Sequence, residues 1–159
     1  MDYLSRATIP FDSDSSEQLM MEWTWLIGED KRLVLVSVIG DVFVTDKHEK
    51  IFWLDTGVGK LEQVAESRHD FFEKLEDHDQ VGDWLMMDLV DELLASGKLL
   101  GVGQVYSYIM SPIIGGEYAV HNFIPLDLEA HLDFTGQFHR QISTLPNGTR
   151  VRIKFENKS

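Results

Sequence analysis

The feature that most constrains the fold is a stretch between residues 32 and 67, which is dense in β-branched and aromatic residues. It consists of the segments RLVLVSVI, DVFVTD, KIFWLD and KLEQVAES, separated by Gly40-Asp41 and by short polar turns at 46–49 and 56–59. Such residues favour β-strands. Links as short as these connect neighbouring strands that run antiparallel to each other. The stretch therefore predicts an antiparallel meander of four strands.

The rest of the chain places helices in blocks instead of alternating them with strands. Helical periodicity appears at 15–27, 67–77, 80–96 and 128–145. Further strands are predicted at QVYSYIM, EYAVHNF and the C-terminal TRVRIKFEN, which alternates apolar and basic residues. This order predicts a single α+β domain over 1–159, with an antiparallel or mixed sheet of six or more strands and helices packed against it. Residues 1–12 are expected to be a flexible lead.

Two residues mark the expected core. Trp23 and Leu89 each lie in the middle of the apolar stripe of a predicted helix, so both are predicted to be buried. Gly97 follows the 80–96 helix at the position where a left-handed residue ends a helix at low cost.

The charge of the chain is strongly negative and uneven. The formal net charge is −13; residues 48–100 hold thirteen acids and five bases, whereas residues 101–159 hold five of each. Binding to nucleic acid requires a basic face, so direct nucleic-acid binding is excluded. An acidic field can instead steer a basic protein partner into contact.

The acids concentrate between residues 62 and 92, where eleven acids face two bases. On the predicted 80–96 helix, Asp88, Asp91 and Glu92 share one face and repel one another. This pattern is typical of a solvated helix face and is also what a surface for a basic partner requires. The candidate partner-binding residues are Glu73, Glu76, Asp83, Asp88, Asp91 and Glu92.

Composition excludes several classes of protein. The chain contains no cysteine, so it has no disulfide, thiolate nucleophile or cysteine-based metal site. It also has no run of eighteen apolar residues and no basic-then-apolar N-terminus, which predicts a cytoplasmic protein that neither spans a membrane nor carries a secretory signal.

No catalytic, metal-binding or nucleotide-binding motif is present. Asp127, Glu129, His131 and Asp133 alternate in sequence, but alternate residues of a helix point about 200° apart and cannot converge on one ion. His131 and His139 are better explained as hydrogen-bonded residues at the border of an apolar stripe. The sequence therefore predicts a non-enzymatic protein without a metal or other cofactor.

One set of aromatic and acidic residues could line a cleft. Trp and Tyr side chains commonly keep their polar ends in water, so packing at the edge of the core is the favoured explanation of the set. A cleft of this kind would suit a small-ligand module, or a hydrolase with a pair of carboxylates. The cleft candidates are Trp53, Asp55, Tyr106, Tyr108, Glu117, Tyr118 and His131.

Between about Met21 and Val151 the chain resembles a known bacterial family. The resemblance is carried by Gly40-Asp41-Val42-Phe43, Trp53-Leu54-Asp55, Gly115-Gly116-Glu117-Tyr118 and Leu145-Pro146-Asn147-Gly148-Thr149. These segments are similar to the C-terminal domain of type VI secretion immunity proteins, a domain formerly of unknown function. In the named immunity protein a further domain precedes this one, whereas only a short segment precedes it here.

The resemblance implies a non-enzymatic cytoplasmic protein that binds and neutralises a cognate nuclease toxin. The acidic surface fits this function, because a nuclease has a basic groove for DNA. The alternative is a small-ligand or regulatory module that uses the aromatic and carboxylate cleft.

Overall fold

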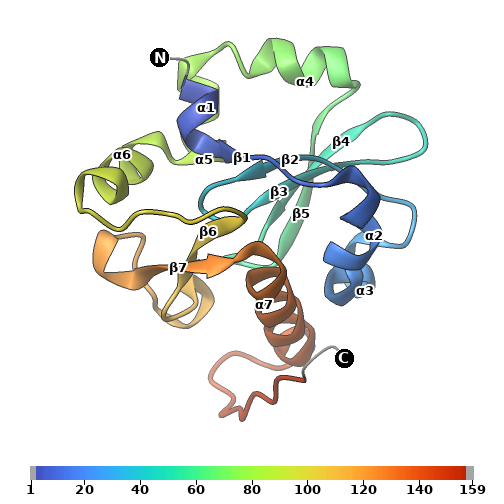
Figure 1. Cartoon of the computed structure of the whole chain (residues 1–159). Helices are drawn as coiled ribbons and strands as arrows, with labels where there is room; N and C mark the ends of the chain where they lie inside the picture. The colour runs from blue at the N-terminus through green and yellow to red at the C-terminus, as the bar shows by residue number, and fades with distance from the viewer. Residues whose placement is uncertain (1–2, 157–159) are drawn as a thin grey trace.

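The computed structural model describes residues 3–156 and contains a five-stranded antiparallel sheet in the order β1-β2-β3-β4-β5 (Figure 1). The predicted meander is confirmed as β2 to β5, and β1 adds an edge strand. The strands are β1 (Thr8–Ile9), β2 (Arg32–Ser37), β3 (Val42–Thr45), β4 (Ile51–Asp55) and β5 (Lys60–Ala65).

Short turns set the register of this sheet. Between β3 and β4, the Asp46 carboxylate accepts the backbone N–H groups of His48 and Lys50, both at 2.9 Å. Between β4 and β5, the Asp55 carboxylate accepts those of Gly57 and Val58 in the same way. Asp side chains commonly accept hydrogen bonds from backbone N–H groups of a turn that have no backbone partner. This explains why these short polar segments form the tight turns between the strands of the meander.

The central strands β2 and β3 are buried on both faces, which explains their nearly continuous apolar runs, whereas β5 exposes Lys60, Glu62 and Gln63. Val36, Val42 and Leu54 belong to a core shared with the N-terminal helices and α7 (Leu128–Ile142), and this core contains the fully buried Trp23. Phe43 belongs to a second core beneath the helices that follow β5.

A separate two-stranded sheet joins β6 (Gln104–Tyr108) and β7 (Phe123–Asp127). The seven strands therefore form two sheets and not one sheet of six or more. The strand predicted at EYAVHNF is wrong, because β7 begins only at Phe123. The preceding loop is held by Asn122, whose side chain bonds the backbone of Met110 and of Glu117, and this contact requires a compact loop.

Helices and short 3-10 turns (η) cover the sheet. In Figure 1, α4 lies at one end of the molecule and α7 at the other. The helices besides α7 are α1 (Tyr3–Ala7), α2 (Ser16–Leu19), α3 (Thr24–Ile27), α4 (Arg68–Lys74), α5 (His78–Leu85) and α6 (Met87–Ala95), with η1 (Ser13–Ser15), η2 (Met21–Trp23), η3 (Pro112–Ile114) and η4 (Val120–Asn122).

The helix predicted at 15–27 is broken into short turns, and two tryptophans explain the break. Trp23 Nε1 donates to Thr135 Oγ1 (3.3 Å) and Trp25 Nε1 donates to the Gly136 carbonyl (3.2 Å), so both indoles reach α7. In a continuous helix they would point about 200° apart. Contact with α7 therefore overrides the local helical pattern.

Both ends of the chain differ from expectation over their described parts. Within the expected flexible lead, residues 3–9 form α1 and β1; Ala7 is fully buried and Thr8 pairs with Ser37. The predicted C-terminal strand is wrong, because residues 150–156 adopt no regular secondary structure. Their apolar and basic alternation is explained by packing along α7, where Gln137 and Gln141 hold the backbone.

Candidate functional site

The helix predicted at 80–96 is two helices, because Met86 adopts a left-handed conformation (φ 50°, ψ 54°) between α5 and α6. The two helices bury their apolar faces in different cores. Trp84 and Leu85 pack around Phe43, whereas Leu89 packs with a core beside β6 and β7. One straight helix could not face both cores, so the chain turns at Met86. The predicted burial of Leu89 is confirmed, since its exposed fraction is 6%.

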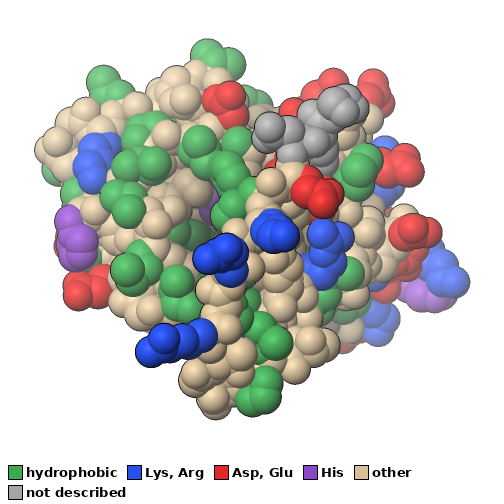
Figure 2. Space-filling model, turned by 90° about the horizontal axis from the view of Figure 1, so that it is seen from below, with side chains coloured by type: hydrophobic (Ala, Val, Ile, Leu, Met, Phe, Trp, Pro, Cys, Tyr) green, Lys and Arg blue, Asp and Glu red, His purple; other side chains and the backbone are tan. Residues whose placement is uncertain are grey.

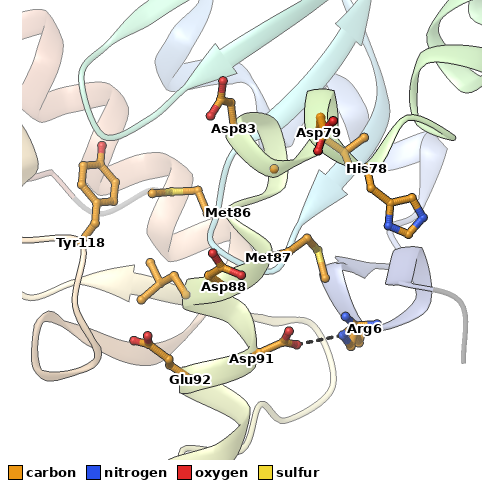
Figure 3. A pocket seen from close by; sticks show the side chains of 13 residues that line it. Arg6, His78, Asp79, Asp83, Met86, Met87, Asp88, Asp91, Glu92 and Tyr118 are labelled. Atoms are coloured by element: carbon orange, nitrogen blue, oxygen red, sulfur yellow. Dashed lines mark hydrogen bonds and ion pairs between the residues drawn. The ribbon is translucent and has the colours of Figure 1, made fainter.

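This bend forms a pocket of about 810 Å³, which we call the acidic pocket (Figure 3). Its side chains come from α1, α5, α6 and the loop that carries Tyr118. Arg6 points across the pocket to α6, where its Nε atom lies 2.9 Å from Asp91 Oδ1 (Figure 3). The residues that define the acidic pocket here are Arg6, Asp79, Asp83, Met86, Met87, Asp88, Asp91, Glu92 and Tyr118.

Four of the six predicted partner-binding residues line the acidic pocket; the list is Asp83, Asp88, Asp91 and Glu92. Glu73 belongs to α4, where it lies 3.4 Å from His69, and Glu76 is exposed in the turn after α4. The acidic surface thus has a local centre on α5 and α6. Among the described residues that line this pocket, Arg6 is the one Lys or Arg, so carboxylates outnumber these cations there.

The predicted cleft residues lie around a different structure, a hydrogen-bonded chain in the interior. His131 Nδ1 is 2.7 Å from Ser107 Oγ, and His131 Nε2 is 3.1 Å from both the Gly40 carbonyl and Thr56 Oγ1. Thr56 Oγ1 is in turn 3.0 Å from Asp41 Oδ1. We call Asp41, Thr56, Ser107 and His131 the buried polar network, since each is at most 5% exposed.

The bonding partners define the protonation of His131. The Gly40 carbonyl can only accept, so Nε2 carries the proton and Nδ1 accepts from the Ser107 hydroxyl. Burial disfavours the imidazolium and lowers the pKa of His131 to about 4, against a smaller opposing effect of the Gly40 carbonyl. The side chain is therefore a neutral link between the two sheets at neutral pH.

Burial also perturbs the acids beside this network. It raises the pKa of Asp41 to about 8, with a further contribution from the charge of Asp55, and donors from Thr56 and Trp53 oppose the rise. Burial likewise raises the pKa of Asp55. Three donors converge on Asp41, from the Thr56 backbone and hydroxyl and the Trp53 indole. These hydrogen bonds tie the buried carboxyl to Thr56, at the start of the β4–β5 turn, and to Trp53 of β4.

Two tyrosines close the network from the β6 side. Tyr108 and Tyr118 meet edge to face with ring centroids 6.3 Å apart, and their hydroxyls lie over Gly57, where a Cβ atom would approach them to 2.8 and 2.7 Å. Among the described residues, the buried Tyr108 hydroxyl has no hydrogen-bond partner. Burial raises the pKa of both tyrosines.

The other predicted cleft residues are dispersed. The Tyr106 hydroxyl donates to the Lys98 carbonyl, and Glu117 is exposed 3.9 Å from His121. The structure therefore brings together Trp53, Asp55, Tyr108, Tyr118 and His131 around the buried polar network; His131 is fully buried, whereas Tyr118 is 40% exposed at the surface.

Sequence reasoning missed three residues of this interior, namely Asp41, Thr56 and Ser107. His139 Nε2 lies 2.9 Å from the Thr56 carbonyl, so His131 and His139 flank one residue of the β4–β5 turn. Across residues 3–156, no group of three or more His, Asp or Glu side chains could hold a metal ion.

The central part of the chain is similar to a known family. Residues 65–139 match the family model of T6SS immunity protein Tdi1, C-terminal. The match confirms the resemblance to type VI secretion immunity proteins over residues 65–139, a shorter span than the predicted 21–151. It also contains all of α4, α5 and α6, including the acidic residues of both pocket helices.

Among solved structures, the chain is similar to Atu4351 from Agrobacterium tumefaciens, with a TM-score of 0.54 and 16% identity. The similarity covers 80% of this chain and 65% of that chain. At this identity it shows a shared fold only. No curated protein sequence matches the chain. No helix within residues 3–156 is long and apolar enough to cross a membrane.

Proposed function

We propose that this protein is an immunity protein that neutralises a cognate nuclease-type toxin by binding it directly, without catalysis. The observation that supports this proposal best is the family match over residues 65–139, which contains both helices of the acidic pocket. The toxin is expected to present a basic surface, as a DNA-binding groove does.

The charge of the acidic pocket suits such a partner. Asp88 and Glu92 are exposed one turn apart on α6, and Asp91 lies beside Glu92. Like charges at this spacing destabilise a helix by a few tenths of a kcal/mol, and a partner rich in Lys and Arg removes that repulsion. Long-range attraction of this kind acts mainly on the association rate and weakens with salt.

The pocket also offers apolar contact area beneath the charges. Met86 lies between α5 and α6, Met87 begins α6, and Tyr118 stands at the edge of the pocket (Figure 3). Methionine adapts its shape to a partner surface, and tyrosine is enriched among residues that dominate binding energy. Acids around an adaptable apolar centre suit the long side chains of Arg and Lys, which carry a charge at the end of an apolar stem.

Reversing the charge of this face tests the proposal. The variant combines Asp88→Lys, Asp91→Lys and Glu92→Lys. Binding to a toxic protein encoded beside this one, measured by titration, should weaken at least tenfold, which corresponds to about 1.4 kcal/mol. Added salt should slow association of the parent. Co-expression of the parent should relieve the toxicity, and the variant should protect less.

A matched control separates the surface from the net charge. Glu29→Lys, Glu49→Lys and Glu62→Lys change the net charge by the same amount at exposed positions outside the pocket. This control should bind the toxin with nearly the affinity of the parent, and all three proteins should unfold at similar urea concentrations. Equal loss of affinity in both triple variants would show that only net charge matters, and unchanged affinity in both would reject this face.

The alternative of a small-ligand module gains little support from the interior. Asp41 is 3% exposed and His131 is fully buried, so a ligand could reach them only if the two sheets separated. The perturbed pKa values there follow from burial of structural groups, which also occurs outside functional sites.

A further inference from the structure

The C-terminal segment is held on α7 by two glutamines that bond only to its backbone. Gln137 accepts the N–H of Glu156 at 2.7 Å and donates to its carbonyl at 3.0 Å. Gln141 accepts the N–H of Lys154 at 3.2 Å and donates to its carbonyl at 2.7 Å. Each amide thus satisfies both backbone groups of one residue, as a neighbouring strand would.

The spacing of these contacts suits an extended peptide. Four residues of helix rise about 6 Å, and two residues of extended chain span about 6.6 Å. Alternate residues of the segment therefore meet successive glutamines on one side of α7. Because the bonds reach only backbone atoms, they do not depend on the sequence of the bound segment.

An apolar groove of about 600 Å³ runs beside this contact, between β6, β7, η3 and α7. Ile153 and Phe155 line it from the segment, and the Phe155 ring lies edge to face on Phe134 with centroids 4.8 Å apart. Figure 2 looks at the molecule from this side and shows hydrophobic side chains gathered there beside Lys and Arg side chains. The groove walls include Ile109, Met110, Ile114, Ile124, Phe134 and Phe138.

The segment fills this groove incompletely. Ile109 remains 61% exposed and Met110 50%, while Phe155 itself remains 47% exposed. Contiguous exposed apolar side chains on a folded protein commonly mark a contact surface. A ligand with larger apolar side chains would cover more of the groove than residues 150–156 do.

We propose that this groove binds an extended segment of a partner protein, with large apolar side chains at alternate positions, and that residues 150–156 occupy the site until such a segment displaces them. Gln137 and Gln141 are the backbone-binding residues. The identical segment of a second copy would leave the same walls exposed, so the geometry favours a different protein. This site lies apart from the acidic pocket and does not depend on the toxin-binding proposal.

The test uses the full chain and a labelled peptide. The probe is TRVRIKFEN carrying Ile153→Phe, which enlarges a side chain that faces the groove and keeps Phe155 as the second large apolar residue. The protein variant carries Ile153→Asp and Phe155→Asp, which weaken its own segment. Fluorescence anisotropy should show that the peptide binds this variant at least tenfold more tightly than it binds the parent, where the resident segment competes.

Matched changes identify the glutamine contacts. Adding Gln141→Ala to the weakened variant should reduce peptide affinity at least tenfold, whereas adding Gln63→Ala, on β5, should not. If Gln141→Ala does not fold, a peptide N-methylated at Lys154 tests the same contact, because it lacks the N–H that Gln141 accepts; its affinity should fall at least fivefold.

Three outcomes would overturn the proposal. The peptide could fail to bind the weakened variant, or it could bind regardless of both Gln141→Ala and the N-methyl group. Alternatively, the parent could form a dimer that Phe155→Asp dissociates, which would make a second copy the occupant. None of these results bears on the acidic pocket, so this proposal and the toxin-binding proposal can fail separately.

Discussion

Replacing Gly40 with alanine should destabilise the fold far more than a glycine substitution usually does. Gly40 has a φ of +88° between β2 and β3, and a Cβ atom there would overlap His131 Nε2 and lie 2.6 Å from its Cε1 atom. His131 cannot move away without leaving Ser107 and the Gly40 carbonyl. The substitution therefore combines backbone strain with disruption of the buried polar network.

The magnitude follows from these two contributions. A left-handed conformation costs a non-glycine residue about 1–2 kcal/mol. Breaking the contacts of His131 leaves buried polar atoms without partners, at about 1–3 kcal/mol each. We expect a loss of about 3–7 kcal/mol, a large part of the roughly 5–15 kcal/mol that stabilises a domain.

Gly97→Ala provides the matched control. Gly97 has a φ of +85°, and nothing lies within 4 Å of its added Cβ atom, so it pays only the backbone strain of about 1–2 kcal/mol. Urea unfolding followed by fluorescence of the four tryptophans would measure both variants. If the two substitutions cost the same within about 1 kcal/mol, the contact around His131 is not rigid and the reasoning fails.

Three further outcomes are expected. Leu89→Ala should lower the free energy of unfolding by about 2–5 kcal/mol in urea, and a variant as stable as the parent would contradict the 6% exposure of this side chain. Because the pKa of His131 is lower in the folded protein than in the unfolded chain, the unfolded chain binds a proton at His131 at a higher pH than the folded protein does. The free energy of unfolding therefore keeps the contribution of His131 above pH 6.5 and loses about 3 kcal/mol as the pH falls towards about 4. The His131→Gln variant should lack this part of the pH dependence, and parallel curves for parent and variant would reject it. Elemental analysis of the purified protein should find no stoichiometric zinc, iron or copper, and one ion per chain would contradict this expectation.

The meander was predictable from sequence because its determinants are local. The strand pairing depends on apolar segments and on turns at Gly40-Asp41 and Asp46, and each turn lies within a few residues of the strand pairs that it aligns. The break at Met86 was not predictable in this way. Methionine is a good helix former, and its left-handed conformation is imposed by two cores that residues distant in sequence complete.

The candidate sites show the same division. The shared face of Asp88, Asp91 and Glu92 follows from helical spacing, whereas the contact of Arg6 with Asp91 joins residues 85 apart. His131 and the Gly40 carbonyl are 91 positions apart. The only local signal for that contact was a glycine beside an acid in a turn, which many turns share.

Residues 65–139 contain only one side of the buried polar network. Ser107 and His131 lie within this segment, while Gly40, Asp41 and Thr56 come from the meander that precedes or borders it. The segment that matches the family model is therefore shorter than the domain that folds as one structure. A protein made from residues 65–139 alone would expose apolar surface that β2 to β4 normally cover. Exchange of this segment between relatives would preserve the structure only if the recipient also offered a glycine at position 40 and a hydroxyl at position 56 to receive His131.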